Sequence, residues 1–316
     1  MTTAPAPQAP LWRTAQVTGV MLAAVLLVGL IWWPKPSLDL LWNIVIPLVP
    51  ASLLVTPRLW RNVCPLATLN MLLNRPGGRT LTGGALRIAG AGGIVLLLML
   101  VPARRFLFNT NGLALAVTIG AVLLVAVVMG LRFDAKAGFC NAFCPVLPVE
   151  RLYGQAPLAH LSNPRCVPCT HCTSHGCIDL VPRKSIAHTV YVRGNGAGTG
   201  WLATPFGLFA AAFPGFVVGY FTTADAALAQ AGAVYLHVGV WSGASLALVG
   251  LLTLALQVPL AKAAPVLGAT AVTLYYWYAG PSLADALHLG ALGGHVLRGA
   301  AGILVLSWLL RHVRGS

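Results

Sequence analysis

Long apolar runs alternate with short polar stretches along the whole chain. Eight of the runs have roughly bilayer-spanning length, which is about 20 residues for a helix. They are Ala15–Trp33, Leu38–Thr56, Ile88–Phe106, Leu113–Leu131, Trp201–Phe221, Ala233–Leu256, Pro265–Gly280 and Gly290–Leu310. The pattern predicts an all-α polytopic membrane protein with about eight transmembrane helices.

The first two runs need separate comment. Ala15–Trp33 is too long for a signal peptide and precedes "WWPKP" rather than a small-residue cleavage site, so we expect it to remain as an anchor. Leu38–Thr56 contains Pro47 and Pro50, which membrane helices tolerate when neighbours satisfy the freed backbone groups.

Charge sets the expected orientation. Only 8% of the 316 residues are charged, yet the formal net charge is +14. The basic residues are scattered between apolar runs, which argues against a nucleic-acid partner. With both termini in the cytoplasm, sixteen Lys and Arg residues lie on the inner side and three (Lys35, Arg104 and Arg105) on the outer side. This asymmetry predicts a multi-pass protein of the bacterial inner membrane.

The runs divide the chain into three regions. Residues 1–131 form an N-terminal four-helix membrane region with a Cys-Pro turn, residues 132–200 a cytoplasmic cysteine-rich segment, and residues 201–316 a C-terminal four-helix membrane region. All seven cysteines lie in the two inner loops. Because the bacterial cytoplasm is reducing, thiolate chemistry is expected there rather than structural disulfides.

Four cysteines form the main motif of the chain. Cys166, Cys169, Cys172 and Cys177 follow the spacing Cys-x2-Cys-x2-Cys-x4-Cys, close to the ligand run of a bacterial [4Fe–4S] ferredoxin. Structural zinc is the competing interpretation, but zinc favours two cysteine pairs separated by a longer loop. The spacing therefore favours one [4Fe–4S] cluster, held in a small ferredoxin-like loop.

The three remaining cysteines lie in two similar turns. "WRNVCPLATLNML" around Cys64 aligns with "CNAFCPVLPVERL" around Cys140 and Cys144, which suggests a degenerate internal repeat that places Cys64 near Cys144. As a group the three are candidate redox thiols, or ligands of a second metal centre together with an outside ligand. The simpler alternative, which we favour, is reduced thiols that pack a turn.

A Cys-x3-Cys-Pro turn after a membrane helix, followed by the four-cysteine run, resembles the NapH/NosR/CcoG-type family of polytopic membrane [4Fe–4S] ferredoxins. The resemblance covers roughly residues 35–190. It implies electron transfer between the quinone pool and a partner, or redox support for maturing a respiratory metalloenzyme. This chain departs from the family in having one ferredoxin motif instead of two, and Trp60 where a second turn would carry a cysteine.

Ionisable residues in the last helices form a second candidate site. His237 and His295 lie at similar depth in two apolar runs, and Arg298 lies one turn beyond His295. Facing histidines can bind haem b, and the same trio can line a quinone pocket; alternatively, each residue contacts a neighbouring helix. Small residues at four-residue spacing, such as Gly239 and Gly243, are expected to allow close helix packing.

These features predict a membrane-bound electron-transfer protein. One [4Fe–4S] cluster would pass electrons between a membrane donor, for which quinol is the candidate, and a redox protein partner on the basic cytoplasmic face. The alternative is a redox-sensing or assembly factor for a respiratory metalloenzyme. No nucleophile–base set or phosphate loop points to self-contained catalysis, so a component of an oxidoreductase system is the expected role.

Overall fold

Helices make up the fold of this chain. The computed structural model describes residues 9–72, 81, 83–133, 136–159, 161, 198–290 and 292–314, and these contain no β-strand. Seven helical segments in this part of the chain are long and apolar enough to cross a membrane. They are Pro10–Trp32, Pro34–Val55, Gly83–Phe108, Gly112–Arg132, Pro205–Thr222, Leu228–Leu256 and Gly293–Arg314. The expectation of an all-α, multi-pass membrane protein is thereby confirmed.

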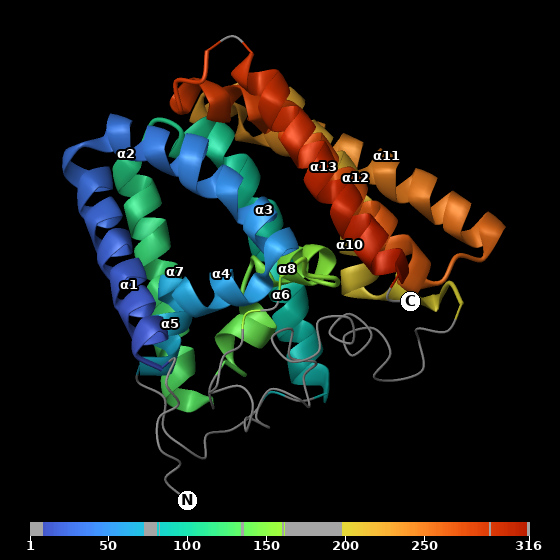
Figure 1. Ribbon diagram of the computed structural model, residues 1–316, viewed down its shortest axis with the longest axis horizontal. Helices are drawn as coiled ribbons and strands as arrows, with labels where there is room; N and C mark the ends of the chain where they lie inside the picture. Colours follow the sequence, from blue (N-terminus) through green and yellow to red (C-terminus); the bar gives the residue numbers. More distant parts are fainter. Residues whose placement is uncertain are drawn as a thin grey trace, which may run out of the picture.

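The N-terminal region contains four of these segments and two short helices. In chain order its elements are α1 (Ala9–Trp32), α2 (Pro34–Leu40), η1 (Leu41–Val45), α3 (Ile46–Val55), α4 (Pro57–Val63), α5 (Pro65–Leu72), α6 (Gly83–Ala103), η2 (Arg104–Phe108) and α7 (Gly112–Arg132). The short α4 and α5 connect the end of α3 to one end of the bundle (Figure 1). η1 and η2 are π-helical turns, which frequently occur at functional sites.

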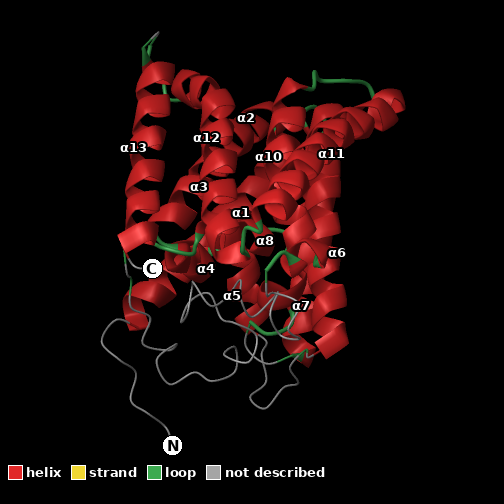
Figure 2. Cartoon of the chain, turned by 90° about the vertical axis from the view of Figure 1, so that its right-hand side faces the viewer, coloured by secondary structure: helices red, strands yellow, loops and turns green. Residues whose placement is uncertain are grey.

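The remaining elements pack beside this region. Two lie in the middle segment, η3 (Phe139–Phe143) and α8 (Leu147–Tyr153), and are followed by η5 (Gly200–Ala203), α10 (Pro205–Thr222), η6 (Leu228–Gln230), α11 (Ala231–Leu256), α12 (Leu260–Ala286) and α13 (Gly293–Arg314). The red and orange helices α10–α13 lie together on one side in Figure 1, and Figure 2 shows α12 and α13 running side by side.

The eighth expected run, Pro265–Gly280, lies within α12 and is not among the seven candidate spans. At 27 residues α12 is long enough, but its sequence includes Lys262, several aromatic residues with polar groups, and Asp285. Many of its side chains are buried against α10 and α13. A helix shielded by its neighbours needs less apolar surface than a helix that faces lipid.

Close helix packing falls on different glycines from those expected. Gly239 and Gly243 of α11 have no heavy atom within 4 Å of a Cβ built on them, so the prediction that they pack is wrong. Instead, a Cβ on Gly215 of α10 would lie 2.0 Å from the carbonyl oxygen of Trp241, and one on Gly219 2.9 Å from Val238 Cα. Glycines of α10, not of α11, therefore allow these two helices to approach closely.

A tyrosine from α12 bridges the proline-containing helix α3. The hydroxyl of Tyr276 donates to the carbonyl oxygen of Pro47 at 2.6 Å and accepts from the backbone N–H of Ala51 at 3.0 Å. Those two backbone groups are partners in a regular α-helix. The second run thus does form a helix despite its prolines. Tyr276 of a neighbouring helix supplies hydrogen-bond partners to its backbone, as burial in a membrane requires.

Candidate functional site

Two Cys-Pro turns have the same local backbone shape. Cys64 ends α4 with φ −58° and ψ 123°, and Cys144 ends η3 with φ −60° and ψ 125°. The residue before a proline is driven into this extended region because the proline ring excludes the α conformation. Each turn then leads toward a short helix, α5 or α8. The structure thus supports the internal repeat proposed from the sequence.

The two turns face one small pocket. Its lining includes the three cysteines Cys64, Cys140 and Cys144 together with Trp60, which aligns with Cys140 in the repeat. The prediction that Cys64 lies near Cys144 is therefore confirmed. Phe139, Leu66 and Val146 contribute apolar walls. Cys140 is buried, whereas Cys64 and Cys144 are partly buried.

Buried charges hold the two turns together. Arg61 of α4 donates from Nη1 to Glu150 Oε2 of α8 at 2.7 Å, and its Nη2 bonds Asn141 Oδ1 in η3. The side chains of Arg61 and Glu150 are 3% and 5% exposed. Lys136 Nζ donates to the Arg61 carbonyl oxygen at 2.9 Å. This charged cluster closes the pocket around the thiols and connects residues 75 to 89 positions apart.

Burial keeps the three thiols protonated. It raises the pKa of Cys140 to about 12, although the positive charges of Arg61 and Lys136 act in the opposite direction. Burial also raises the pKa of Cys144 well above its usual value, with Glu150 adding to the effect, and it raises that of Cys64. Because the thiolate is the reactive form, this environment favours packing thiols over a reactive redox pair.

Hydrogen bonds attach the segment before the four-cysteine run to helices of both membrane regions. Leu158 and Ala159 donate backbone hydrogen bonds to Leu54 and Val55 at the end of α3. Arg58 bonds the Leu161 carbonyl at 2.6 Å, and Arg311 of α13 bonds that of Leu158 at 3.0 Å.

On the return side, Trp201 is fully buried and its Nε1 donates to the Val258 carbonyl at 3.1 Å. Cys166, Cys169, Cys172 and Cys177 themselves lie outside the described residues. The structure therefore describes where the loop is attached, and the cluster stays a prediction.

The second candidate site is not assembled as a trio. His237 lies exposed on α11, within 3.0 Å of Thr222 Oγ1, and α11 packs mainly on α10. His295 is exposed on α13, which packs mainly on α12. Arg298 bonds the Trp277 carbonyl and lies over the Trp277 ring, 4.5 Å from its centroid. This geometry matches the alternative of contacts with neighbouring helices and gives no support to haem or quinone.

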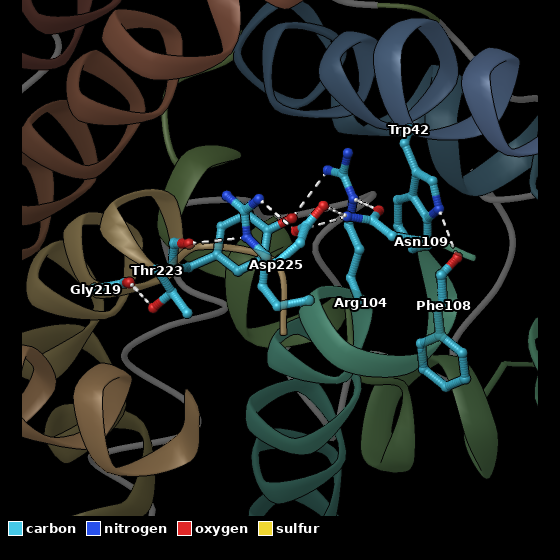
Figure 3. Close-up of polar contacts among 9 residues, drawn as sticks. Trp42, Arg104, Phe108, Asn109, Gly219, Thr223 and Asp225 are labelled. Atoms are coloured by element: carbon cyan, nitrogen blue, oxygen red, sulfur yellow. Dashed lines mark hydrogen bonds and ion pairs between the residues drawn. The ribbon is translucent and has the colours of Figure 1, made fainter. Parts of the chain in front are cut away.

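A polar cluster at the end of α6 was not singled out from the sequence (Figure 3). Arg105 bonds Asp225 Oδ1 at 3.0 Å, and Asn109 Nδ2 contacts both oxygens of Asp225. Arg104 bonds Asn109 Oδ1 and the Tyr220 hydroxyl at 2.7 and 2.9 Å. Arg104 and Asn109 are five residues apart, but Tyr220 and Asp225 lie 116 to 120 residues from their partners, so no local spacing marked the cluster. The available signal was the pair of adjacent arginines between two apolar runs.

The arrangement of metal-binding residue types and the similarity to known proteins complete the description of the site. In the part of the chain that the structure describes, no group of three or more His, Cys, Asp or Glu side chains is arranged to hold a metal ion. No family model matches the chain, and no curated protein or solved structure matches it either. The class that fold and site define is a polytopic helical membrane protein with a cysteine-rich loop.

Proposed function

We propose that this protein transfers electrons in the bacterial inner membrane through one [4Fe–4S] cluster held by Cys166, Cys169, Cys172 and Cys177. The observation that carries the proposal is the Cys-x2-Cys-x2-Cys-x4-Cys spacing, a four-thiolate donor set of the kind that binds such clusters. A bound cluster supplies one-electron redox chemistry. The candidate electron donor is a quinol, and the candidate acceptor is a redox protein on the cytoplasmic side.

The framework around the loop is suited to this role. Arg58 on one side and Arg311 on the other hold the start of the loop, and buried Trp201 holds its end. Both ends of the loop are thus attached to the helices of the membrane region, on the side where the proposal places the cluster.

The proposed topology has eight crossings with both termini in the cytoplasm. α12 follows α11 and precedes α13, and it packs along α13 (Figure 2), so it crosses the same layer in the opposite direction. Counting α12 restores the agreement between helix number and the distribution of basic residues. The loop and the thiol pocket then share the cytoplasmic side.

A redox-sensing or assembly role is the second candidate. In its thiol-based form it requires a Cys140–Cys144 pair of low pKa, and burial moves the pKa of both thiols upward instead. A sensor that responds through the cluster itself stays compatible with the same cysteine run.

The proposal is tested by purifying the full chain anaerobically in detergent, measuring iron and acid-labile sulfide, and recording EPR spectra after dithionite reduction. We expect about four irons and four sulfides per chain, with a reduced-cluster signal that Cys169→Ser abolishes. Cys64→Ser is the matched control, because that cysteine lies in the buried pocket, and it should retain iron, sulfide and signal.

Two results would overturn the proposal. Zinc without sulfide would indicate a structural metal site. Iron that is lost equally in Cys64→Ser and Cys169→Ser would mean that the cluster requires the pocket thiols.

A further inference from the structure

We propose that Arg104 and Tyr220 bind the phosphate oxygens of an anionic phospholipid head group, at the end of α6 away from the thiol pocket. The inference rests on the geometry of the polar cluster in Figure 3 and is independent of the proposed electron transfer.

The first observation is the incomplete neutralisation of Arg104. Its neighbour Arg105 forms an ion pair with Asp225, and Asn109 Nδ2 donates hydrogen bonds to both oxygens of that carboxylate. Arg104 contacts only neutral groups among the described residues, namely Asn109 Oδ1, the Tyr220 hydroxyl and the face of the Trp42 ring at 4.7 Å. A half-buried guanidinium compensated by dipoles alone retains its attraction for an oxyanion.

The second observation is a hydroxyl with a donor to spare. Tyr220 is only 6% exposed, and its oxygen accepts the hydrogen bond from Arg104 Nη1. No acceptor for its own hydrogen is present among the described residues. Buried hydroxyls ordinarily find an acceptor. One oxyanion beside Arg104 would take both the guanidinium and the Tyr220 O–H.

The third observation is the backbone around these side chains. Arg104 begins the π-helical turn η2, and Trp42 lies in the π-helical turn η1. The two turns are joined by a hydrogen bond from Trp42 Nε1 to the Phe108 carbonyl at 3.2 Å. π-helical turns interrupt the regular hydrogen-bond ladder of an α-helix and frequently occur at functional sites. Here both turns present side chains to the same point.

The position selects a lipid over a protein or a soluble anion. Arg104 belongs to the candidate span Gly83–Phe108, and Trp42 and Tyr220 belong to the spans Pro34–Val55 and Pro205–Thr222. Arg104 lies four residues before the end of its span and Tyr220 two residues before the end of its span, near the depth of lipid head groups, whereas Trp42 lies further inside its span. Arginine binds phosphate oxygens by charge-assisted hydrogen bonds, and an anionic phospholipid presents such oxygens at this depth.

The test compares the full-length protein with Arg104→Gln, Tyr220→Phe and Lys35→Gln, each purified in the same mild detergent and delipidated. Short-chain phosphatidylglycerol, phosphatidylcholine and inorganic phosphate are titrated separately, and binding is followed by calorimetry and native mass spectrometry. Lys35→Gln is the control because Lys35 is an exposed positive charge on the same side, outside the cluster. Size-exclusion profiles and helical circular dichroism establish that each variant is folded.

We expect phosphatidylglycerol to bind one site, with Arg104→Gln weakening it about tenfold or more and Tyr220→Phe about threefold to tenfold. Tyr220→Phe keeps the ring under Arg105, so it reports on the hydroxyl even if Arg104→Gln fails to fold. Equal affinity in the wild type and Tyr220→Phe would overturn the site. Equal binding of phosphatidylcholine would overturn the requirement for an anionic lipid, and equal affinity for inorganic phosphate would overturn the lipid as its source.

Discussion

Two ion pairs in different parts of the molecule differ in their surroundings. Arg61–Glu150 beside the thiol pocket has an N–O distance of 2.7 Å, with side chains 3% and 5% exposed. Arg105–Asp225 at the far end of α6 has a distance of 3.0 Å, with side chains 16% and 58% exposed. Both join segments far apart in the chain. Distance alone would make them equivalent, whereas burial makes them different kinds of contact.

The difference follows from solvation. Removing one member of a buried pair leaves the other charge without water or partner, at a cost of about 3–5 kcal/mol, whereas an exposed pair contributes about 0–1 kcal/mol. The thiol pocket should therefore be rigid and intolerant of substitution. The cluster around Arg105 and Asp225 is partly exposed to water and also contains the positive charge of Arg104, which suits a site that exchanges ligands.

The largest effect is expected in thiol reactivity. A pKa of about 12 for Cys140, in place of 9.0, lowers its thiolate fraction at pH 8 about a thousandfold. Iodoacetamide should therefore label Cys140 in the folded protein about a thousandfold more slowly than glutathione, as measured by mass spectrometry of its peptide. The rate should still rise with pH above 9, where glutathione levels off. Labelling of Cys140 at the glutathione rate would refute burial of this thiol.

The next largest effect concerns the buried pair. Glu150→Gln removes the carboxylate that pairs with buried Arg61 and should lower the free energy of unfolding by about 3 kcal/mol, measured by denaturant unfolding in mixed micelles. The double variant Arg61→Met/Glu150→Leu is the control, since it removes both charges. It should be more stable than Glu150→Gln alone, and a double variant that is less stable would contradict the role assigned to burial.

The smallest effect is expected at the exposed pair. Asp225→Asn is the matched carboxyl-to-amide change and should lower the free energy of unfolding by at most about 1 kcal/mol in the same assay. Added salt should reduce even this difference, because the pair is partly in water. A loss of unfolding free energy as large as that of Glu150→Gln would contradict the distinction between the buried and the exposed ion pair.

Local sequence patterns predicted the helices and the shape of each Cys-Pro turn, because both depend on short-range chemistry, and the internal repeat predicted that the two turns lie together. Apolar runs marked the candidate spans, and a proline after Cys64 and Cys144 fixed the same backbone shape at each. The raised pKa of Cys140 was beyond sequence reasoning, because burial depends on Arg61 and Glu150 arriving from elsewhere in the chain.

Neighbour relations between helices were the main source of error. Equal depth suggested that His237 and His295 face each other, but depth does not decide which helices become neighbours, and α11 packs on α10. The four-residue spacing of Gly239 and Gly243 places them on one face without deciding whether that face is covered. The Arg104 cluster needed three segments brought together, which no single pattern records.

The bridge from Tyr276 to α3 has a consequence for biosynthesis. Its hydroxyl accepts a hydrogen bond from the backbone N–H of Ala51, a residue that is synthesised 225 positions earlier in the chain. At a synthesis rate of about 5–20 residues per second, α3 enters the membrane about 10–45 s before that hydroxyl exists. During this interval water or other nascent helices must provide hydrogen-bond partners for the backbone of α3 around Pro47 and Pro50. The second membrane segment is therefore completed only when one of the last helices arrives.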